Sequence, residues 1–320
     1  LFGATPGIEA IQTRADKAYD QCDRYQRTCA LVQVPGGGSY AVDFFRVDGG
    51  KQHQYGFQCN GELAGVVPDR ITPIDRDHKW LANFRSADCE PPVRATWRDE
   101  DVSMDLVMLS DLDEFLVADA PGWRSDAGSE LDKPPIQQIF AERTAEDSLD
   151  SRYAAVMVPY TSDTSPVISA DLIADSPEAV AVRVEHASGT DYLISSLTEE
   201  TRSYGPVTMG GGFGYVSLGA DDRVSKAYLL DGTNLKCGDV SLQMPQGSMT
   251  VDVESVGGRT YHLAEPLPDE LQCRGTYLLA ADTGYEIEST DEDSITVRDY
   301  PALDCEQVQI LNSAWFELSQ

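Results

Sequence analysis

The sequence predicts an all-β fold, an antiparallel multi-stranded β-sandwich with few short helices. Two observations lead to this prediction. Apolar and polar residues alternate with a period of two wherever the chain shows a pattern, as expected for strands with one buried face. Turn-forming pairs, such as Pro121-Gly122 and Ser188-Gly189, recur at short intervals between these segments. Many short strands punctuated in this way are typical of stacked antiparallel sheets.

The clearest strands lie near the N-terminus. Residues 30–34 and 40–47 form a predicted hairpin around a glycine-rich turn at 35–39. Asp48-Gly49-Gly50 supplies the next turn, and residues 51–59 form a third strand. Because side chains alternate along a strand, two sets are expected on its opposite faces. One set is His53, Tyr55, Phe57 and Cys59, and the other is Gln52, Gln54 and Gln58.

Later segments continue the pattern. Residues 102–108, 180–186 and 251–253 alternate in the same way and predict further strands. Composition favours a helix within 8–27 and a short one at 135–146. A soft boundary at 160–166 divides the chain into a first part of the sandwich, 1–160, and a second part, 161–320. The two parts either form one continuous domain or pack as two sheets in tandem.

The charge is strongly acidic. The chain has 54 Asp and Glu against 24 Lys and Arg, which gives a net charge of −30. Such a surface repels nucleic acid and anionic lipid, so neither is an expected partner. No apolar run is long enough for a membrane-spanning helix, and the first ten residues lack the features of a signal peptide. The acidic coat fits an extracellular or periplasmic protein whose signal has already been removed.

The sequence gives little indication of a metal site or a reactive thiol. The seven cysteines form no C-x-x-C pair, and with only four histidines a zinc site is not expected. In an extracellular protein disulfides are expected, and Cys22–Cys29 is the most local pairing. The carboxylates near Asp111 lack the spacing of a calcium loop, which favours a solvated turn. The glycine run 210–214 lacks the spacing of a phosphate loop, which favours a β-bulge or a close sheet contact.

One region carries a family resemblance. Tyr25-Gln26-Arg27-Thr28, the apolar strand after it and residues 40–57 (YAVDFFRVDGGKQHQYGF) resemble the heparinase II/III family of polysaccharide lyases. The resemblance implies the β-sheet part that follows the catalytic α/α toroid of that family. It covers about thirty residues. Two differences stand out: Gln58-Cys59 replaces a second histidine, and the H-x-H, D-S-G and H-N-T-V motifs of the catalytic and metal-binding region are not found.

Three residues are candidate substrate contacts in this region. His53 and Tyr55 share one face of a strand, where they either line a sugar-binding cleft or form hydrogen bonds in the core between two sheets. Arg46 either pairs with a substrate carboxylate or forms an ion pair with a residue such as Asp43. The catalytic residues are not identifiable. No metal or other cofactor is expected on this chain, although a divalent metal fits the upstream part that the resemblance implies.

Two functions follow from these observations. The leading one is the C-terminal β-sandwich part of a heparinase II/III-like lyase, which cleaves a uronate-containing polysaccharide by elimination. In that case an N-terminal catalytic polypeptide completes the enzyme, because elimination needs a base, an acid and a group that neutralises the carboxylate. The alternative is a non-catalytic extracellular module, either a carbohydrate-binding protein or a structural protein that assembles with copies of itself. Polysaccharide is the expected partner of the lyase and of the carbohydrate-binding module.

Overall fold

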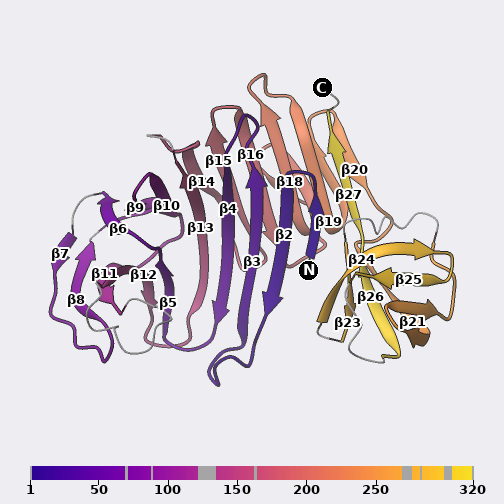
Figure 1. The fold of residues 1–320 in the computed structure, drawn as a ribbon, viewed down its shortest axis with the longest axis horizontal. Coiled ribbons are helices and arrows are strands. Elements are labelled where there is room, and N and C mark those ends of the chain that lie inside the picture. Colours follow the sequence, from indigo (N-terminus) through magenta and orange to yellow (C-terminus); the bar gives the residue numbers. More distant parts are fainter. Residues whose placement is uncertain are drawn as a thin grey trace. The chain divides into compact units, whose positions relative to one another are not determined.

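The computed structural model describes residues 2–68, 71–87, 89–121, 135–161, 164–268, 276–281, 283–298 and 305–318. All regular structure in these ranges is β, in several antiparallel sheets, which confirms the predicted fold class (Figure 1). The described residues contain no helix, and thus none that is long and apolar enough to cross a membrane. The chain divides into two compact units, and each is described by itself.

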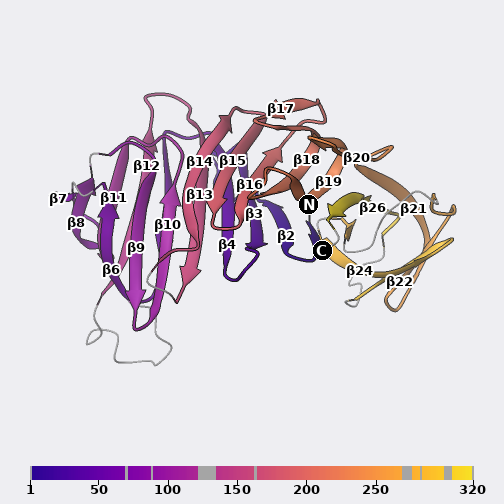
Figure 2. The same cartoon turned by 90° about the horizontal axis from the view of Figure 1, so that it is seen from above.

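The first unit, here called the sandwich unit, contains residues 14–27 and 34–172. Its larger sheet contains, in spatial order, β4 (Ser39–Asp48), β13 (Asp150–Tyr160), β10 (Val102–Met108), β9 (Val93–Asp99) and β6 (Glu62–Val67). Figure 2 shows β9, β10 and β13 side by side in this sheet. The second sheet has the order β5 (Gln52–Gln58), β12 (Ile136–Thr144), β11 (Glu114–Ala120), β8 (Ala82–Ala87) and β7 (Ile71–Pro73).

Apolar side chains from both sheets of the sandwich unit form one core. Trp97 and Tyr153 of the larger sheet pack in the same cluster as Tyr55, Phe115 and Ile139 of the second sheet. The alternation predicted for the third strand is confirmed, because His53 and Tyr55 of β5 are buried while Gln52, Gln54 and Gln58 are exposed. The core therefore fixes which side of β5 faces inward and leaves its glutamines at the surface.

The second unit, here called the barrel unit, contains Leu1–Thr13, Thr28–Gln33 and Ile173–Gln320. Its sheet runs through β15 (Ala179–His186), β16 (Gly189–Ser196), β18 (Val207–Gly219), β19 (Val224–Cys237) and β20 (Val240–Gln243). The short strands β17 (Arg202–Tyr204) and β27 (Ser313–Glu317) pair with β18 and β19. At the N-terminus, β1 (Phe2–Thr5) pairs with β2 (Ile8–Arg14). The strands β3 (Arg24–Gln33) and β14 (Val167–Asp175) each contain residues of both units.

The C-terminal part of the barrel unit is a closed barrel. Its strands follow the order β21 (Ser248–Gly257), β22 (Thr260–Leu263), β25 (Ser294–Val297), β24 (Thr283–Asp291), β23 (Tyr277–Ala280) and β26 (Gln307–Leu311). It has its own core, which includes Tyr261, Leu278, Ile295 and Ile310. Nothing in the sequence patterns predicted closure, since closure depends on which distant strands pair.

The glycine run of residues 210–214 lies within β18. The register of β18 against β19 shifts between Gly210 and Gly211, so the predicted bulge is confirmed. A side chain at Gly211 would place its Cβ 2.3 Å from the Cα of Gly232 on the neighbouring strand. The glycines therefore permit a close backbone approach rather than forming a phosphate-binding loop.

Both helix predictions are wrong for the described residues. Residues 8–14 form β2, where Ile8 and Ala10 are buried and alternate with exposed Glu9, and the following residues lead through turns into β3. Residues 136–144 form β12, which pairs with β11 on one side and β5 on the other. Hydrogen-bonded pairing along both edges of β12 and burial of Ile139 and Ala141 outweigh the weak helix propensity of this segment.

The expected disulfide is also absent: no two of the described cysteines lie at bonding distance. Cys29 lies inside β3, and Cys22 precedes that strand. Residues 24–29 of an extended strand span roughly 17 Å at about 3.3 Å per residue. A disulfide needs Cα atoms within roughly 7 Å, so an extended β3 separates this pair.

Candidate functional site: an uncharged cavity beside β5

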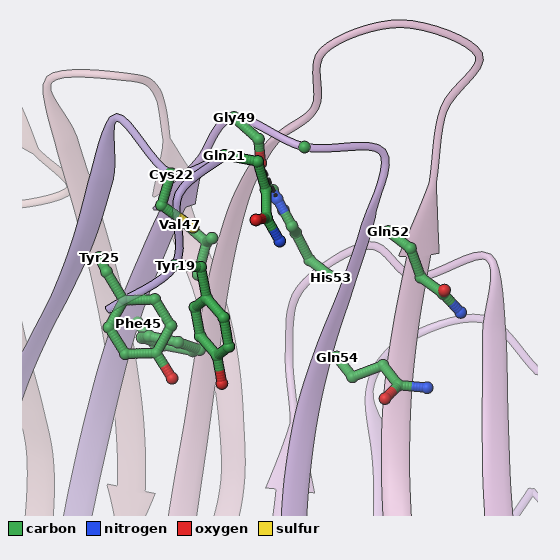
Figure 3. Close-up of a pocket in the computed structure, with 11 residues that line it drawn as sticks. Tyr19, Gln21, Cys22, Tyr25, Phe45, Val47, Gly49, Gln52, His53 and Gln54 are labelled. Atoms are coloured by element: carbon green, nitrogen blue, oxygen red, sulfur yellow. Dashed lines mark hydrogen bonds between the residues drawn. The ribbon is translucent and has the colours of Figure 1, made fainter. Parts of the chain in front are cut away.

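The sandwich unit has a cavity at the turn between β4 and β5, with a volume of about 240 Å³ (Figure 3). Three segments line it: the loop before β3 with the start of that strand, the end of β4, and the turn into β5. Their lining residues are Tyr19, Gln21, Cys22, Tyr25, Phe45, Val47, Gly49, Gly50, Gln52, His53 and Gln54. No residue of this lining is an acid, a lysine or an arginine.

The Asp48-Gly49-Gly50 turn holds the loop against the strands. Gly49 has a φ of 92°, and a Cβ on it would lie 2.2 Å from the carbonyl oxygen of Gln21. Only glycine fits this backbone conformation and this close approach without strain. The Asp23 amide donates a hydrogen bond of 2.9 Å to the Asp48 carbonyl, and the Gly49 amide donates one of 3.0 Å to Leu149. These contacts position Tyr19 and Tyr25 over the end of β4.

Three aromatic rings form one wall of the cavity. The rings of Tyr19 and Tyr25 lie 5.7 Å apart, and Tyr25 meets Phe45 edge to face at 4.9 Å. Phe45 belongs to the core, whereas Tyr19 is 54% exposed. Burial raises the pKa of Tyr25, so its hydroxyl stays neutral at neutral pH. The wall therefore presents an apolar ring surface with polar phenol groups to solvent.

Two glutamines of β5 also line the cavity, and Figure 3 shows their side chains extending away from Tyr19 and Tyr25. The Nε2 atoms of Gln52 and Gln54 donate hydrogen bonds of 2.6 and 2.5 Å to one carboxylate oxygen of Glu142 on β12. Arg76 donates to the same oxygen at 2.9 Å. Burial by itself would raise the pKa of Glu142, but these three donors outweigh it and lower the pKa. Both amide groups are thus held against Glu142 of β12.

His53 is fixed on both ring nitrogens. Its Nε2 lies 2.6 Å from the carbonyl oxygen of Gly49, and its Nδ1 lies 2.8 Å from the Ser151 hydroxyl. A carbonyl can only accept, so Nε2 carries the proton and Nδ1 accepts from Ser151 in the neutral ring. His53 is also buried. It closes the floor of the cavity and has no nitrogen available to remove a proton from a ligand.

The described residues that line the cavity supply neither an activated nucleophile nor a metal site. Burial, together with the charge of Asp23, raises the pKa of Cys22, which keeps this thiol protonated and poorly nucleophilic. No group of three or more His, Cys, Asp or Glu side chains suitable for a metal occurs among the described residues. His78, the histidine of a charged loop, accepts hydrogen bonds from the amides of Trp80 and Leu81 on its Nδ1.

The other two predicted contacts lie outside the cavity lining. Tyr55 is buried, and its hydroxyl donates to Asp43 at 2.9 Å. Arg27 forms an ion pair with the same carboxylate at 2.9 Å and lies over the rings of Phe45 and Tyr55. Arg46 is 1% exposed and lies opposite Arg152 in the register of β4 and β13. Of the three candidates, the structure thus brings His53 alone to the cavity.

Sequence reasoning missed most residues of this site. Composition predicts a helix that includes Tyr19 and Tyr25, and this gives no reason to pair them with β4. Gln52 and Gln54 were recognised as one face of a strand, but nothing linked them to Glu142, about ninety residues later. The pair of glutamines at alternating positions beside a Gly-Gly turn was the available signal.

No protein-family model matches the chain, and no curated protein matches it significantly by sequence.

Proposed function

We propose that this chain is a non-catalytic carbohydrate-binding module, and that the cavity beside β5 holds one uncharged sugar ring. The observation that carries this proposal is the aromatic wall of a small cavity, with Tyr19 exposed, whose lining has no acid, lysine or arginine. Sugars have apolar C–H faces and a rim of hydroxyls, so they suit a site with one aromatic side and a few fixed polar groups.

Size supports a single ring in the cavity. A volume of about 240 Å³ is below the roughly 300–1,000 Å³ of pockets for drug-sized ligands. A longer glycan would therefore place one residue in the cavity and extend along the surface. The exposed ring of Tyr19 would cover the apolar face of that residue.

Charge favours a neutral ligand. The chain carries a net charge of −30, and no cation lines the cavity to offset the repulsion of a uronate or sulfate group. The acidic coat also supports the extracellular or periplasmic location proposed for the protein. Polysaccharide is accordingly the proposed partner.

Among the described residues that line the cavity, none is available as a base, and this supports binding rather than chemistry. Both nitrogens of His53 are used within the protein, and the thiol of Cys22 is held protonated. The resemblance to heparinase II/III lyases, and with it eliminative cleavage of a uronate-containing polysaccharide completed by an upstream catalytic part, stays a prediction.

A glycan array tests the proposal. The wild-type chain is expected to bind neutral glycans in preference to uronate-containing or sulfated ones. Covering roughly 60 Å² of the Tyr19 ring at about 25 cal/mol per Å² gives about 1.5 kcal/mol, which is about a tenfold change in Kd. Tyr19→Ala should therefore weaken binding about tenfold. Trp315→Ala removes a comparably exposed aromatic side chain (49% exposed) from the other unit and should leave binding unchanged.

Two results would contradict the proposal. One is an array on which no neutral glycan binds. The other is a bound glycan whose affinity is the same for the wild type and Tyr19→Ala. Release of unsaturated uronate from any polysaccharide by the purified chain would instead support the lyase prediction.

A further inference from the structure

A second, separate groove crosses the outer face of the larger sheet of the sandwich unit. It has a volume of about 450 Å³. Three strands, β6, β9 and β10, supply most of it, and the end of β13 and the start of β14 complete it. Its lining residues are Ala64, Gly65, Val67, Arg94, Thr96, Arg98, Asp105, Tyr160, Thr164, Ser165 and Val167.

Strand register places the polar groups of this groove in rows. Arg94, Thr96 and Arg98 alternate along β9 and therefore share one face. On one side Thr96 is paired with Gly65 of β6, and on the other with Asp105 of β10. Gly65, Thr96 and Asp105 thus form a row across three strands, with Arg94 and Arg98 on either side of it. Gly65 contributes no side chain to this row.

Gly65 leaves an open slot between the arginines. A Cβ built on Gly65 would meet no atom within 4 Å. Beside it on β6, Val67 is 63% exposed and is paired with Arg94. The groove therefore combines cationic groups, an empty space on the sheet surface and an exposed apolar side chain.

The positive charge in the groove exceeds its negative charge by one. Arg94 donates to buried Asp105 at 3.3 Å, and Asp105 also accepts from Thr96 and Tyr160. Arg98 has no ion pair among the described residues, although Glu62 lies opposite it in register. Among the lining residues, the two arginines and Asp105 give +2 − 1 = +1, in a protein whose net charge is −30, while Glu62 lies outside the lining. A positive groove in such a protein is a local exception to the acidic coat.

We propose that this groove binds a carboxylate attached to a small apolar body. A guanidinium presents a planar fork of donors that matches the two oxygens of a carboxylate. With one excess positive charge, a singly charged group is balanced, whereas a phosphate with a charge of about −1.5 to −2 is not. The carboxylate lies over Gly65 between Arg94 and Arg98, and the apolar body lies against Val67. The site is separate from the cavity beside β5, for which sugar binding is proposed.

Fluorine NMR with a matched pair of probes tests this site on the full chain. The probe is 4-fluorobenzoate, and 4-fluorobenzamide is its uncharged control of the same shape. Fragments of this size bind with a Kd on the order of 1 mM at best. Broadening and shift of the benzoate signal, with no change in the benzamide signal, are expected. No response to benzoate up to tens of millimolar, or an equal response to both probes, would overturn the proposal.

Two kinds of variant connect binding to the groove. Arg98→Gln is expected to weaken benzoate binding about tenfold, while Arg259→Gln, an exposed arginine of the barrel, should leave it unchanged. Gly65→Val fills the open slot and places a β-branched residue in a strand, so it should abolish binding without lowering the unfolding midpoint. If neither Arg98→Gln nor Gly65→Val changes the affinity for benzoate, the probe binds elsewhere. That result would overturn the assignment to this groove.

Discussion

The glycines of the Asp48-Gly49-Gly50 turn provide a sharp test of how the cavity is built. Gly49 and Gly50 have similar φ angles of 92° and 82°, so alanine at either position incurs a similar backbone strain, about 1–3 kcal/mol. Their surroundings differ. A Cβ on Gly49 would lie 2.2 Å from the backbone oxygen of Gln21. A Cβ on Gly50 would instead lie 3.2 Å from Cγ in the flexible side chain of Gln21.

The collision determines the expected difference. Gly50→Ala should lower the free energy of unfolding only by this backbone strain of about 1–3 kcal/mol, because the Gln21 side chain can move aside. Gly49→Ala adds an overpacking cost of typically 1–3 kcal/mol, because backbone has to shift. We therefore expect Gly49→Ala to be less stable than Gly50→Ala by about 2 kcal/mol. It should also weaken sugar binding, because the displaced loop carries Tyr19.

Urea unfolding followed by tryptophan fluorescence measures this difference, because buried Trp97 reports on the core of the sandwich unit. Equal midpoints for the two variants, with equal slopes, would refute the account of the turn. Wild-type sugar affinity in Gly49→Ala would refute the role of the turn in positioning the tyrosine wall.

Three further predictions concern other parts of the chain. Asp191→Ala should destabilise the barrel unit by about 3–5 kcal/mol, because Asp191 is buried, lies 3.2 Å from His186 and accepts from Tyr215. Trp97→Ala should cost about 3–5 kcal/mol in urea unfolding, because its ring is 1% exposed and its indole donates to the Gln137 carbonyl. Glu142 has a lowered pKa in the folded chain, so its contribution to stability is present above its unfolded pKa of about 4.3 and is lost as pH falls through the folded value.

The two alanine substitutions have matched controls, and a Glu142→Gln variant tests the third prediction. Asp221→Ala removes a largely exposed partner of Arg223 and should change stability by less than about 1 kcal/mol. Trp315→Ala serves the same purpose for Trp97, because Trp315 is 49% exposed. Glu142→Gln should reduce the loss of stability on acidification in a pH series of urea unfolding curves. A Glu142→Gln variant with the full acid dependence of the wild type would contradict the assignment to this carboxylate.

Local patterns predicted much of the fold and little of the site. The two faces of β5 followed directly from alternation, and the glycine run was correctly expected to form a bulge. The two helix predictions are wrong because residues 8–14 and 136–144 pair with neighbouring strands, and composition does not reveal these partners. The same limit applies to the barrel, whose closure requires pairing between β21 and β26.

The cavity illustrates this limit at the level of side chains. His53 was identified because it follows a Gly-Gly turn on a patterned strand. Tyr19 lies in a loop without periodicity, and Glu142 becomes relevant only because β12 pairs with β5. The interactions that define the site join distant segments, and a single sequence carries no direct signal of them.

The most direct test of sugar binding is to observe the tyrosine wall itself. In a chain labelled with 3-fluorotyrosine, the signals of Tyr19 and Tyr25 can be assigned with Tyr19→Phe and Tyr25→Phe, and then followed as a neutral oligosaccharide is added. We predict that these two signals shift with a common Kd while the other tyrosine signals stay in place. Saturating binding without a shift at Tyr19 or Tyr25, or with shifts at other tyrosines, would contradict the proposed site.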